Sequence, residues 1–388
     1  MRILLIFIDM LRSDLALKKQ RSGDDGELIK ICHQLGGTLF EACYTTAPDT
    51  YRSLGSFWSS LYPKMNGCDN RNKKTYDFLR DPNDSFLGKL KKENYTFNLF
   101  SGTWETDKIG IFPNVYNSKS DRLSTGLFLD DYLDEIKVDD DTITFFNLED
   151  LHFILDDGKY TDQSYAEGIH KVCELINRIF EKKPCDVFDE IIMFSDHGFR
   201  FCYEDEGDDL DGRRSNIFLF WHHRGDRELF FDRKIRSIMD VYPTLLDCCK
   251  VEYDKDNIEG KSLLDTEGHD YLMLEDHSSF YASYLQPVNK WAIVDSNGMY
   301  FIDEDYVWKD SDGHQASVSE AYSRYLIDKA TNFSDMILLR EKNLEYSMGS
   351  HYSLRGFLSD GTKREVKKVF LIHRIYSKVN KILQKFKI

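Results

Sequence analysis

Short runs of apolar residues recur along the first two-thirds of the chain. Most of them are nearly unbroken, whereas a strand with one face in water would alternate apolar and polar positions. Unbroken runs of this length are typical of strands that are covered on both faces. We therefore predict strands at residues 1–8, 95–100, 142–148, 190–194 and 216–221.

The segments between these runs carry helical signals. Apolar residues recur at helical spacing, and prolines, glycines and polar caps mark the ends. We predict helices at 27–35, from Pro48–Asp49–Thr50 to about Leu61, at 162–182 and at 240–246. Strands and helices that alternate in this way predict an α/β fold, with a mostly parallel central sheet and helices on both faces.

The pattern changes after about residue 270. Short apolar runs at 291–294 and 299–302 flank the turn at 295–298, and this arrangement predicts a hairpin. We therefore expect a main domain at 1–270, a smaller C-terminal α+β portion at 271–358 and a final helix at 359–388.

The last segment is basic on an acidic protein. Residues 363–388 hold nine Lys or Arg against one acid, Glu365, while the whole chain carries a net charge of −16. Apolar and basic positions fall on opposite sides of a helix, which predicts a basic amphipathic helix that binds an anionic membrane surface. The alternative is a helix that docks on the acidic face of the protein itself.

Composition narrows the class of protein. At 41% hydrophobic and 30% charged residues, the 388-residue chain is typical of a globular protein. Its acidic balance argues against a nucleic-acid partner. The opening apolar run is too short for a membrane span or a signal peptide, and the eight cysteines show no C-x-x-C pair. These features predict a cytoplasmic protein, peripheral on the inner face of the membrane through its basic helix.

Titratable residues follow three of the predicted strands. Asp9 ends the first strand, His152 follows the strand at 142–148, and Asp196 and His197 follow the strand at 190–194. The carboxyl ends of parallel strands share one edge of a sheet, where ligands bind. Gly198 permits the chain to turn there. Carboxylates and an imidazole brought together at this edge predict a metal site.

Five motifs in order resemble a known family. The chain resembles the sulfatase-like branch of the alkaline phosphatase superfamily, which includes phosphoethanolamine and phosphoglycerol transferases. The resemblance covers about residues 1–250 and is weaker in the C-terminal part. The motifs are Ile8–Asp14, Ala47–Pro63, Asn147–His152, Ser195–Gly198 and Asp240–Leu246.

The resemblance assigns roles to several residues. It implies that Asp9, Asp196 and His197 bind a divalent metal ion, with the Thr50 hydroxyl completing the site. Manganese or zinc is the expected ion, with magnesium or calcium as alternatives. Thr50 is then the nucleophile. His152 contacts the substrate or protonates the leaving group.

The nucleophile motif departs from the family pattern. Aligning backwards from Leu61–Tyr62–Pro63 places Thr50 on the nucleophile, Arg52 where proline is common and Ser59–Ser60 where Thr-Gly is usual. Thr45 and Thr46 are the alternative nucleophiles. The candidates for substrate binding are Arg52, Ser53, Arg213 and Arg214, although the paired arginines are also typical of plain surface charge.

Thr50 also bears on the chemistry. Sulfatases of this family oxidise Cys or Ser to formylglycine, whereas the extra methyl group of threonine would give a ketone. The resemblance therefore implies a phosphotransferase of cell-surface polysaccharide biosynthesis. It would move phosphoethanolamine or phosphoglycerol from a phosphorylated lipid or activated donor to a glycan or lipid acceptor through a phosphothreonine intermediate. The alternatives are a phosphodiesterase or phosphatase with the same site and an inactive homologue that binds without catalysis.

Overall fold

The computed structural model describes most of the predicted main domain and part of the C-terminal portion. The described residues are 1–18, 25–66, 68, 85–101, 115–117, 126, 129–204, 210–277, 289–296, 298–302 and 308–309. The basic helix predicted at 363–388 lies outside them, as does the middle of the acidic loop at 203–211.

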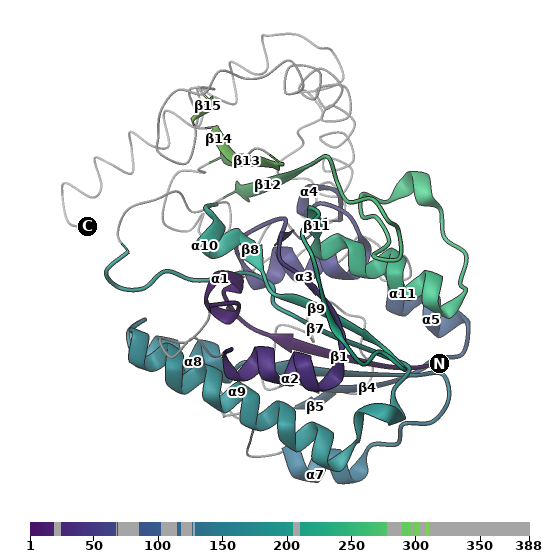
Figure 1. Cartoon of the computed structure of the whole chain (residues 1–388). Helices are drawn as coiled ribbons and strands as arrows, with labels where there is room; N and C mark the ends of the chain where they lie inside the picture. The colour runs from purple at the N-terminus through teal and green to yellow at the C-terminus, as the bar shows by residue number, and fades with distance from the viewer. Residues whose placement is uncertain are drawn as a thin grey trace, which may run out of the picture.

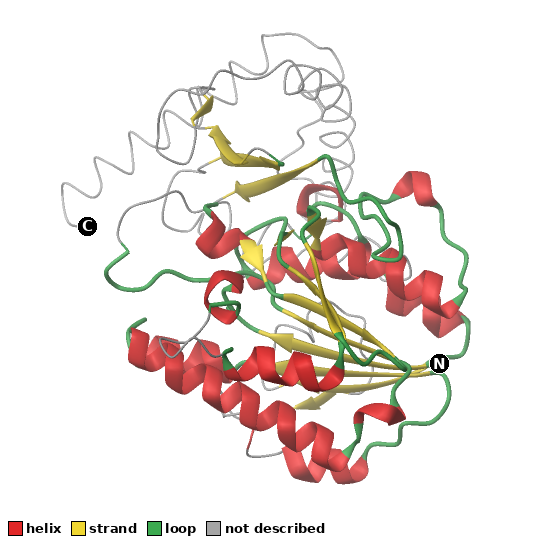
Figure 2. Cartoon of the chain, in the orientation of Figure 1, coloured by secondary structure: helices red, strands yellow, loops and turns green. Residues whose placement is uncertain are grey.

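An eight-stranded sheet forms the centre of the molecule (Figures 1 and 2). Its pairings are parallel, except that β9 runs antiparallel to both of its neighbours. In spatial order the strands are β10 (Leu229–Asp232), β2 (Gly37–Phe40), β9 (Leu219–His223), β7 (Glu190–Phe194), β1 (Arg2–Ile8), β6 (Thr142–Leu148), β4 (Thr96–Ser101) and β5 (Val115–Asn117).

Helices cover both faces of this sheet, as the sequence predicted (Figure 2). One face packs against α3 (Thr50–Ser59), α5 (Phe86–Lys92) and α11 (Val241–Cys249). The other packs against α2 (Glu27–Leu35), α7 (Leu129–Glu135), α8 (Asp150–Asp157) and α9 (Asp162–Lys182). The predicted bounds of α2 and α9 are confirmed.

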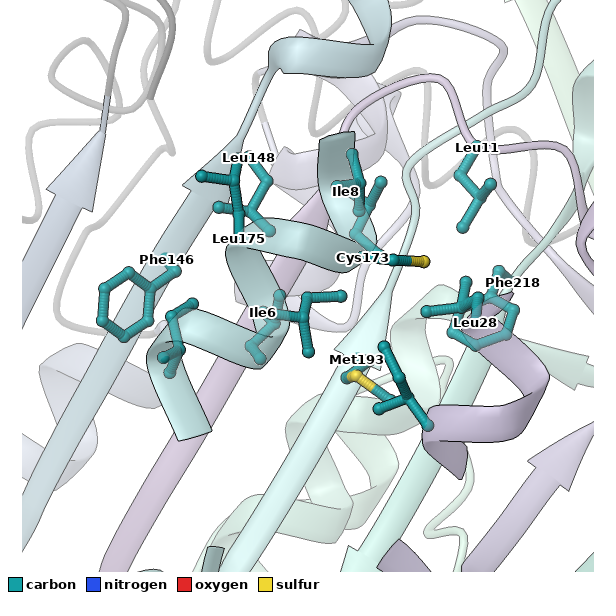
Figure 3. Close-up of a cluster of buried hydrophobic side chains, with 14 of the residues drawn as sticks. Ile6, Ile8, Leu11, Leu28, Phe146, Leu148, Cys173, Leu175, Met193 and Phe218 are labelled. Atoms are coloured by element: carbon teal, nitrogen blue, oxygen red, sulfur yellow. The ribbon is translucent and has the colours of Figure 1, made fainter. Parts of the chain in front are cut away.

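Strand β1 is apolar from Ile3 to Ile8 because both of its faces are covered by helices. Ile3, Leu5 and Phe7 belong to the core under α3, whereas Leu4, Ile6 and Ile8 belong to the core under α9. Successive side chains of a strand point to opposite faces, so a strand between two helical layers needs an apolar residue at every position. Figure 3 shows Ile6 and Ile8 among Phe146, Leu175 and Met193 in the second of these cores.

One predicted strand is wrong as a single element. Residues 216–221 divide into β8 (Asn216–Ile217), which joins a three-stranded sheet with β3 (Cys43–Tyr44) and β11 (Arg236–Ser237), and β9 of the central sheet. The division falls at Phe218, whose backbone N–H donates to Ser195 Oγ and whose carbonyl accepts from the Ser195 N–H. Pairing with Ser195 on both sides lets the chain pass between the two sheets at Phe218.

The C-terminal portion contains the predicted hairpin. Strands β13 (Asn289–Asp295) and β14 (Gly298–Ile302) pair antiparallel, with Asp295 opposite Gly298. Strands β12 (Tyr271–His277) and β15 (Trp308–Lys309) extend them to a four-stranded sheet. In the part of the chain that is described, no helix combines the length and apolar character needed to span a bilayer.

Two helices differ in their bounds from the prediction, and the remaining helical elements are short. The helix predicted to run to about Leu61 ends at Ser59, because Ser60 adopts the left-handed conformation, with φ at 58°. The helix predicted at 240–246 begins as a 3₁₀ turn and continues to Cys249. The short elements are α1 (Ser13–Ala16), α4 (Pro63–Asn66), α10 (Gly212–Ser215), η3 (Cys185–Val187), η4 (Ile238–Asp240) and η5 (Lys255–Asn257).

Candidate metal centre and nucleophile

Three neighbouring strands end at the same edge of the central sheet. In the register, Ile8 of β1 lies opposite Leu148 of β6, and Phe7 lies opposite Phe194 of β7. The residues that follow these strand ends therefore meet. Asp9, Asp196 and His197 each offer a ligand atom, and these atoms lie within 4.8 Å of one another. The predicted metal ligands thus come together as a cluster that can hold a metal ion.

Thr50 reaches this cluster from the first position of α3. Asp49 caps the helix, because its side chain accepts the backbone N–H of Arg52. Thr50 Oγ1 lies 3.4 Å from Asp9 Oδ1 and 3.3 Å from His197 Nε2. The free N–H groups and the dipole at this helix end favour an anion beside the hydroxyl.

The predicted alternatives to Thr50 face other partners. The Thr45 hydroxyl donates to the Ala47 carbonyl and to Ser53 Oγ, and the Thr46 hydroxyl donates to Ser56 Oγ. Ser53, predicted to bind substrate, donates to the Asp196 carbonyl at 2.8 Å. These buried hydroxyls tie α3 to the segment before it and to the Asp196 backbone.

The chemistry of the cluster fits a divalent cation. His197 Nδ1 lies 2.8 Å from the Gly198 carbonyl, so it carries the proton and leaves the Nε2 lone pair toward the cluster. Asp196 Oδ1 accepts the backbone N–H groups of Met10 and His197. Asp196 Oδ2 is buried and accepts no hydrogen bond from the described residues. A buried carboxylate oxygen without a donor is costly, and a cation at this point would satisfy it.

The backbone around the ligands is adapted to this arrangement. Met10 follows Asp9 with a positive φ of 63°, which is uncommon for a residue with a side chain and turns its N–H to Asp196. The sequence suggested that Gly198 permits a turn, whereas the structure requires glycine there because of close packing. Its φ is not positive, but a Cβ there would lie 2.0 Å from the Arg213 carbonyl oxygen, so close approach of two backbones demands glycine.

The pKa values of Asp9 and Asp196 are shifted in opposite directions. Burial alone would raise the pKa of Asp9, but His152 and His197 beside it hold that pKa below its usual value. Burial raises the pKa of Asp196 to about 6, against the opposing effect of His197 and with the help of the Asp9 charge. The histidines thus stabilise the charged form of Asp9. At Asp196 burial outweighs the effect of His197, so the charged form of Asp196 would gain more from a bound cation.

His152 lies beside the cluster, as predicted. Its Nδ1 is 2.8 Å from Asp9 Oδ2, and its Nε2 is 3.5 Å from Asp156 Oδ2. Burial would lower the pKa of His152, but the Asp9 carboxylate, with Asp156 and Asp196, raises it to about 9. His152 is therefore a protonated imidazole near neutral pH, which is the form that can act as a general acid.

The three arginines predicted to bind substrate contact different partners. Arg214 Nη2 donates to the carbonyl of Pro48, directly before the cap of α3, so this guanidinium lies beside the nucleophile segment. Arg213 pairs with Asp211 at 2.5 Å. Arg52 is only 2% exposed and pairs with Asp49 and with Asp276 of β12. Arg214 thus contacts the segment before α3, while Arg213 and Arg52 pair with carboxylates.

The position of Arg52 makes a testable prediction. Arg52→Ala should lower the free energy of unfolding by about 3–5 kcal/mol, because it removes a buried guanidinium that pairs with Asp49 and Asp276, whose side chains are only 14% and 17% exposed. Urea denaturation measures this loss. Arg233→Ala is the control, since Arg233 pairs with Glu41 while 84% exposed and should cost at most about 1 kcal/mol. Unchanged stability with a raised KM would instead favour direct substrate binding by Arg52.

Sequence reasoning did not find two residues that surround the site. Asp156 lies in the last turn of α8 and Tyr160 follows that helix, and both form a chain with His152. The Asp156 position has a local signal, because it stands four residues after His152 and so shares its helix face. A third neighbour, Asp276, pairs with Arg52 from another sheet. The sequence does not show this pairing, since only the folded chain brings β12 to α3.

Comparison with known proteins bears on the fold. No family model matches the chain, and no curated protein matches it by sequence. Solved structures do match. A sulfatase candidate from Bacteroides thetaiotaomicron is 13% identical with a TM-score of 0.65, over 89% of this chain and 94% of that one. The phosphonate monoester hydrolase of Agrobacterium radiobacter is 13% identical with a TM-score of 0.57, over 87% and 96%.

A third structure is assigned to the superfamily itself. It is a protein in the alkaline phosphatase superfamily from Vibrio parahaemolyticus, 14% identical with a TM-score of 0.59, and the match covers 89% of this chain and 86% of that one. The fold is therefore the sulfatase-like fold of the alkaline phosphatase superfamily, as the five sequence motifs predicted. At this level of identity the likeness establishes the fold, and the activity has to be argued from the site.

Proposed function

We propose that this protein is a metal-dependent phosphotransferase that forms a phosphothreonine at Thr50. The observation that carries the proposal is the position of the Thr50 hydroxyl, 3.4 Å from Asp9 and 3.3 Å from His197 at the start of α3. A bound divalent cation would supply a lowered pKa for that hydroxyl and positive charge for the phosphoryl oxygens.

The residues of the chain provide the remaining parts of the reaction. Thr50 releases its proton to solvent, and its oxygen attacks phosphorus. The bond to the leaving oxygen breaks, and His152 gives that oxygen a proton. Arg214 and the N-terminus of α3 bind the non-bridging oxygens. The acceptor hydroxyl then gives its proton to the neutral His152 and attacks phosphorus, the bond from phosphorus to Thr50 Oγ1 breaks, and Thr50 takes back a proton from solvent.

The proposed substrates follow the sequence resemblance. The transferred group is of the phosphoethanolamine or phosphoglycerol type, its donor is a phosphorylated lipid or an activated donor, and its acceptor is a glycan or lipid. Membrane binding by the basic segment at 363–388 would bring the site to such substrates. Manganese or zinc is the proposed ion, since one imidazole and two carboxylates suit both metals.

A hydrolase is the second candidate, and the fold comparison favours it. The phosphonate monoester hydrolase of Agrobacterium radiobacter shares this fold over 87% of the chain. The same Thr50 and His152 would serve a hydrolase, with water in place of the glycan or lipid as final acceptor. The two candidates therefore differ only in what attacks the phosphothreonine.

Turnover of model esters tests the proposal. Protein stripped with EDTA and reloaded with manganese or zinc should release nitrophenol from a nitrophenyl phosphodiester or phosphonate monoester and not from the nitrophenyl sulfate. A transferase should also attach the group to an added glycan or lipid acceptor, whereas a hydrolase should give the same products without one. No turnover of any phosphorus ester with any of the four candidate metals would favour the inactive binding homologue.

A further inference from the structure

Helix α8 carries a chain of polar contacts that ends at His152. The Tyr160 hydroxyl donates to Asp156 Oδ1, the other Asp156 oxygen lies 3.5 Å from His152 Nε2, and His152 Nδ1 lies 2.8 Å from Asp9 Oδ2. His152 and Asp156 are four residues apart, so they project from the same helix face. The imidazole is therefore held at both ends, by Asp9 on one side and by Asp156 with Tyr160 on the other.

The backbone after α8 is bent to bring Tyr160 to this chain. Lys159 and Tyr160 have positive φ angles of 55° and 56°, and two successive residues with side chains seldom adopt this conformation. The Tyr160 N–H donates to the Leu155 carbonyl, and the Tyr160 carbonyl accepts the N–H of Cys202 at 2.9 Å. Strain of this kind persists where the surrounding structure demands it, and here it turns the tyrosine back toward the last turn of its own helix.

The contact between His152 and Asp156 suits a proton donor. A separation of 3.5 Å is too long for a firm hydrogen bond, so the Nε2 proton is oriented by the carboxylate without being bound tightly. The His152 side chain also keeps 32% of its surface exposed, which leaves its edge open to an arriving ester. Nδ1, in contrast, is fixed on a proposed metal ligand.

We propose that Asp156 and Tyr160 are positioning residues that hold His152 ready to protonate the leaving group. In the reaction the His152 Nε2 proton passes to the leaving oxygen as its bond to phosphorus breaks, and Asp156 and Tyr160 keep their own protonation states. Tyr160 orients Asp156, and Asp156 orients the imidazole. This inference rests on the proposed function, because it assigns these residues to the same reaction.

Leaving-group dependence separates positioning from a structural role. The metal-loaded enzyme is compared on two aryl phosphodiesters that differ only in the group expelled, dinitrophenol or phenol. Dinitrophenolate leaves without a proton, whereas phenolate benefits from one. Asp156→Asn and Tyr160→Phe should lower kcat for the phenyl ester by about 10- to 100-fold and change the dinitrophenyl ester far less. In a His152→Gln background, Asp156→Asn should cause no further loss.

Two matched variants control for general damage. Asp157→Asn removes the neighbouring acid of the same helix, which is exposed. Tyr253→Phe removes a tyrosine that donates to Asp247 at 3.1 Å outside the site, and so breaks a Tyr–Asp pair of the same chemistry. Both controls should match the wild type on both esters. Equal losses on the two esters for Asp156→Asn and Tyr160→Phe would overturn the inference in favour of a structural role.

A second readout does not depend on turnover. In ¹⁵N-histidine NMR spectra, assigned with His152→Gln, the Nδ1–H of His152 should exchange slowly with solvent, because the ring is held with Nδ1 2.8 Å from Asp9. It should exchange faster in Asp156→Asn and Tyr160→Phe, where the ring is less firmly oriented, and remain unchanged in Asp157→Asn. If the wild type hydrolyses neither ester, the proposed function fails. The exchange measurement still shows whether Asp156 and Tyr160 hold the His152 imidazole in place. Unchanged exchange in both variants would refute the positioning role.

Discussion

Thr50→Ala is expected to abolish turnover of phosphorus esters, with a loss on the order of 10⁴- to 10⁶-fold in kcat, as when a covalent nucleophile is removed from other enzymes. The hydroxyl is the group at the start of α3 that faces Asp9 and His197. Metal content should remain close to that of the wild type, because Asp9, Asp196 and His197 still provide three ligands. Steady-state kinetics and metal analysis on the same preparation measure both quantities.

Three variants show whether the loss belongs to the nucleophile. Thr50→Ser keeps a hydroxyl and should retain turnover. Thr46→Ala removes a buried hydroxyl nearby that is bonded to Ser56 and should leave kcat largely intact. Wild-type protein quenched during turnover should carry a phosphorylated peptide that contains Thr50, and Thr50→Ala should not. A Thr50→Ala variant with wild-type kcat, or a phosphorylated Thr45 or Thr46, would contradict the assignment.

The sequence predicted those parts of the fold that depend on local pattern. The run at 142–148 has apolar residues on both faces because β6 is buried along its whole length, and the long α9 shows its buried stripe directly. The meeting of Asp9, Asp196 and His197 was also predictable, since these residues directly follow such strands and parallel strands end together. A polar residue at the end of an apolar run is a strong signal because burial there is costly without a partner.

The features of the fold and site that the sequence did not predict depend on contacts between segments that are distant in the chain. No local pattern shows that Phe218 lies where the chain passes from one sheet to another. The sequence marked Arg52 as a cation near the nucleophile, but its partner Asp276 is 224 residues away. Tyr160 reaches Asp156 only because its backbone adopts an uncommon conformation, and sequence propensity predicts the opposite. Charge pairing and backbone strain are properties of the folded chain.

Asp196→Asn is expected to stabilise the protein without metal and to remove its response to metal. Asp196 is fully buried with an unsatisfied Oδ2, and burial raises its pKa to about 6, so the charged form is unfavourable without a cation. An asparagine amide would keep the Met10 and His197 N–H bonds on Oδ1 and can donate to His197 Nε2, which lies 3.2 Å from the replaced oxygen. In EDTA the variant should gain about 1–3 kcal/mol in unfolding free energy.

The order of stabilities should reverse when metal is added. A cation at about 1,000 times its Kd stabilises the wild type by about 4.1 kcal/mol, whereas Asp196→Asn loses the carboxylate that binds it. Asp9→Asn is the control, because its expected change in the stability of the metal-free protein has the opposite sign. Histidines hold the pKa of Asp9 low and His152 contacts it at 2.8 Å, so removing that charge should destabilise the metal-free protein. Urea unfolding with EDTA and with manganese or zinc, together with metal analysis, distinguishes the variants. Equal destabilisation of both in EDTA, or a full equivalent of metal in Asp196→Asn, would show that Asp196 is an ordinary buried carboxylate rather than a metal ligand.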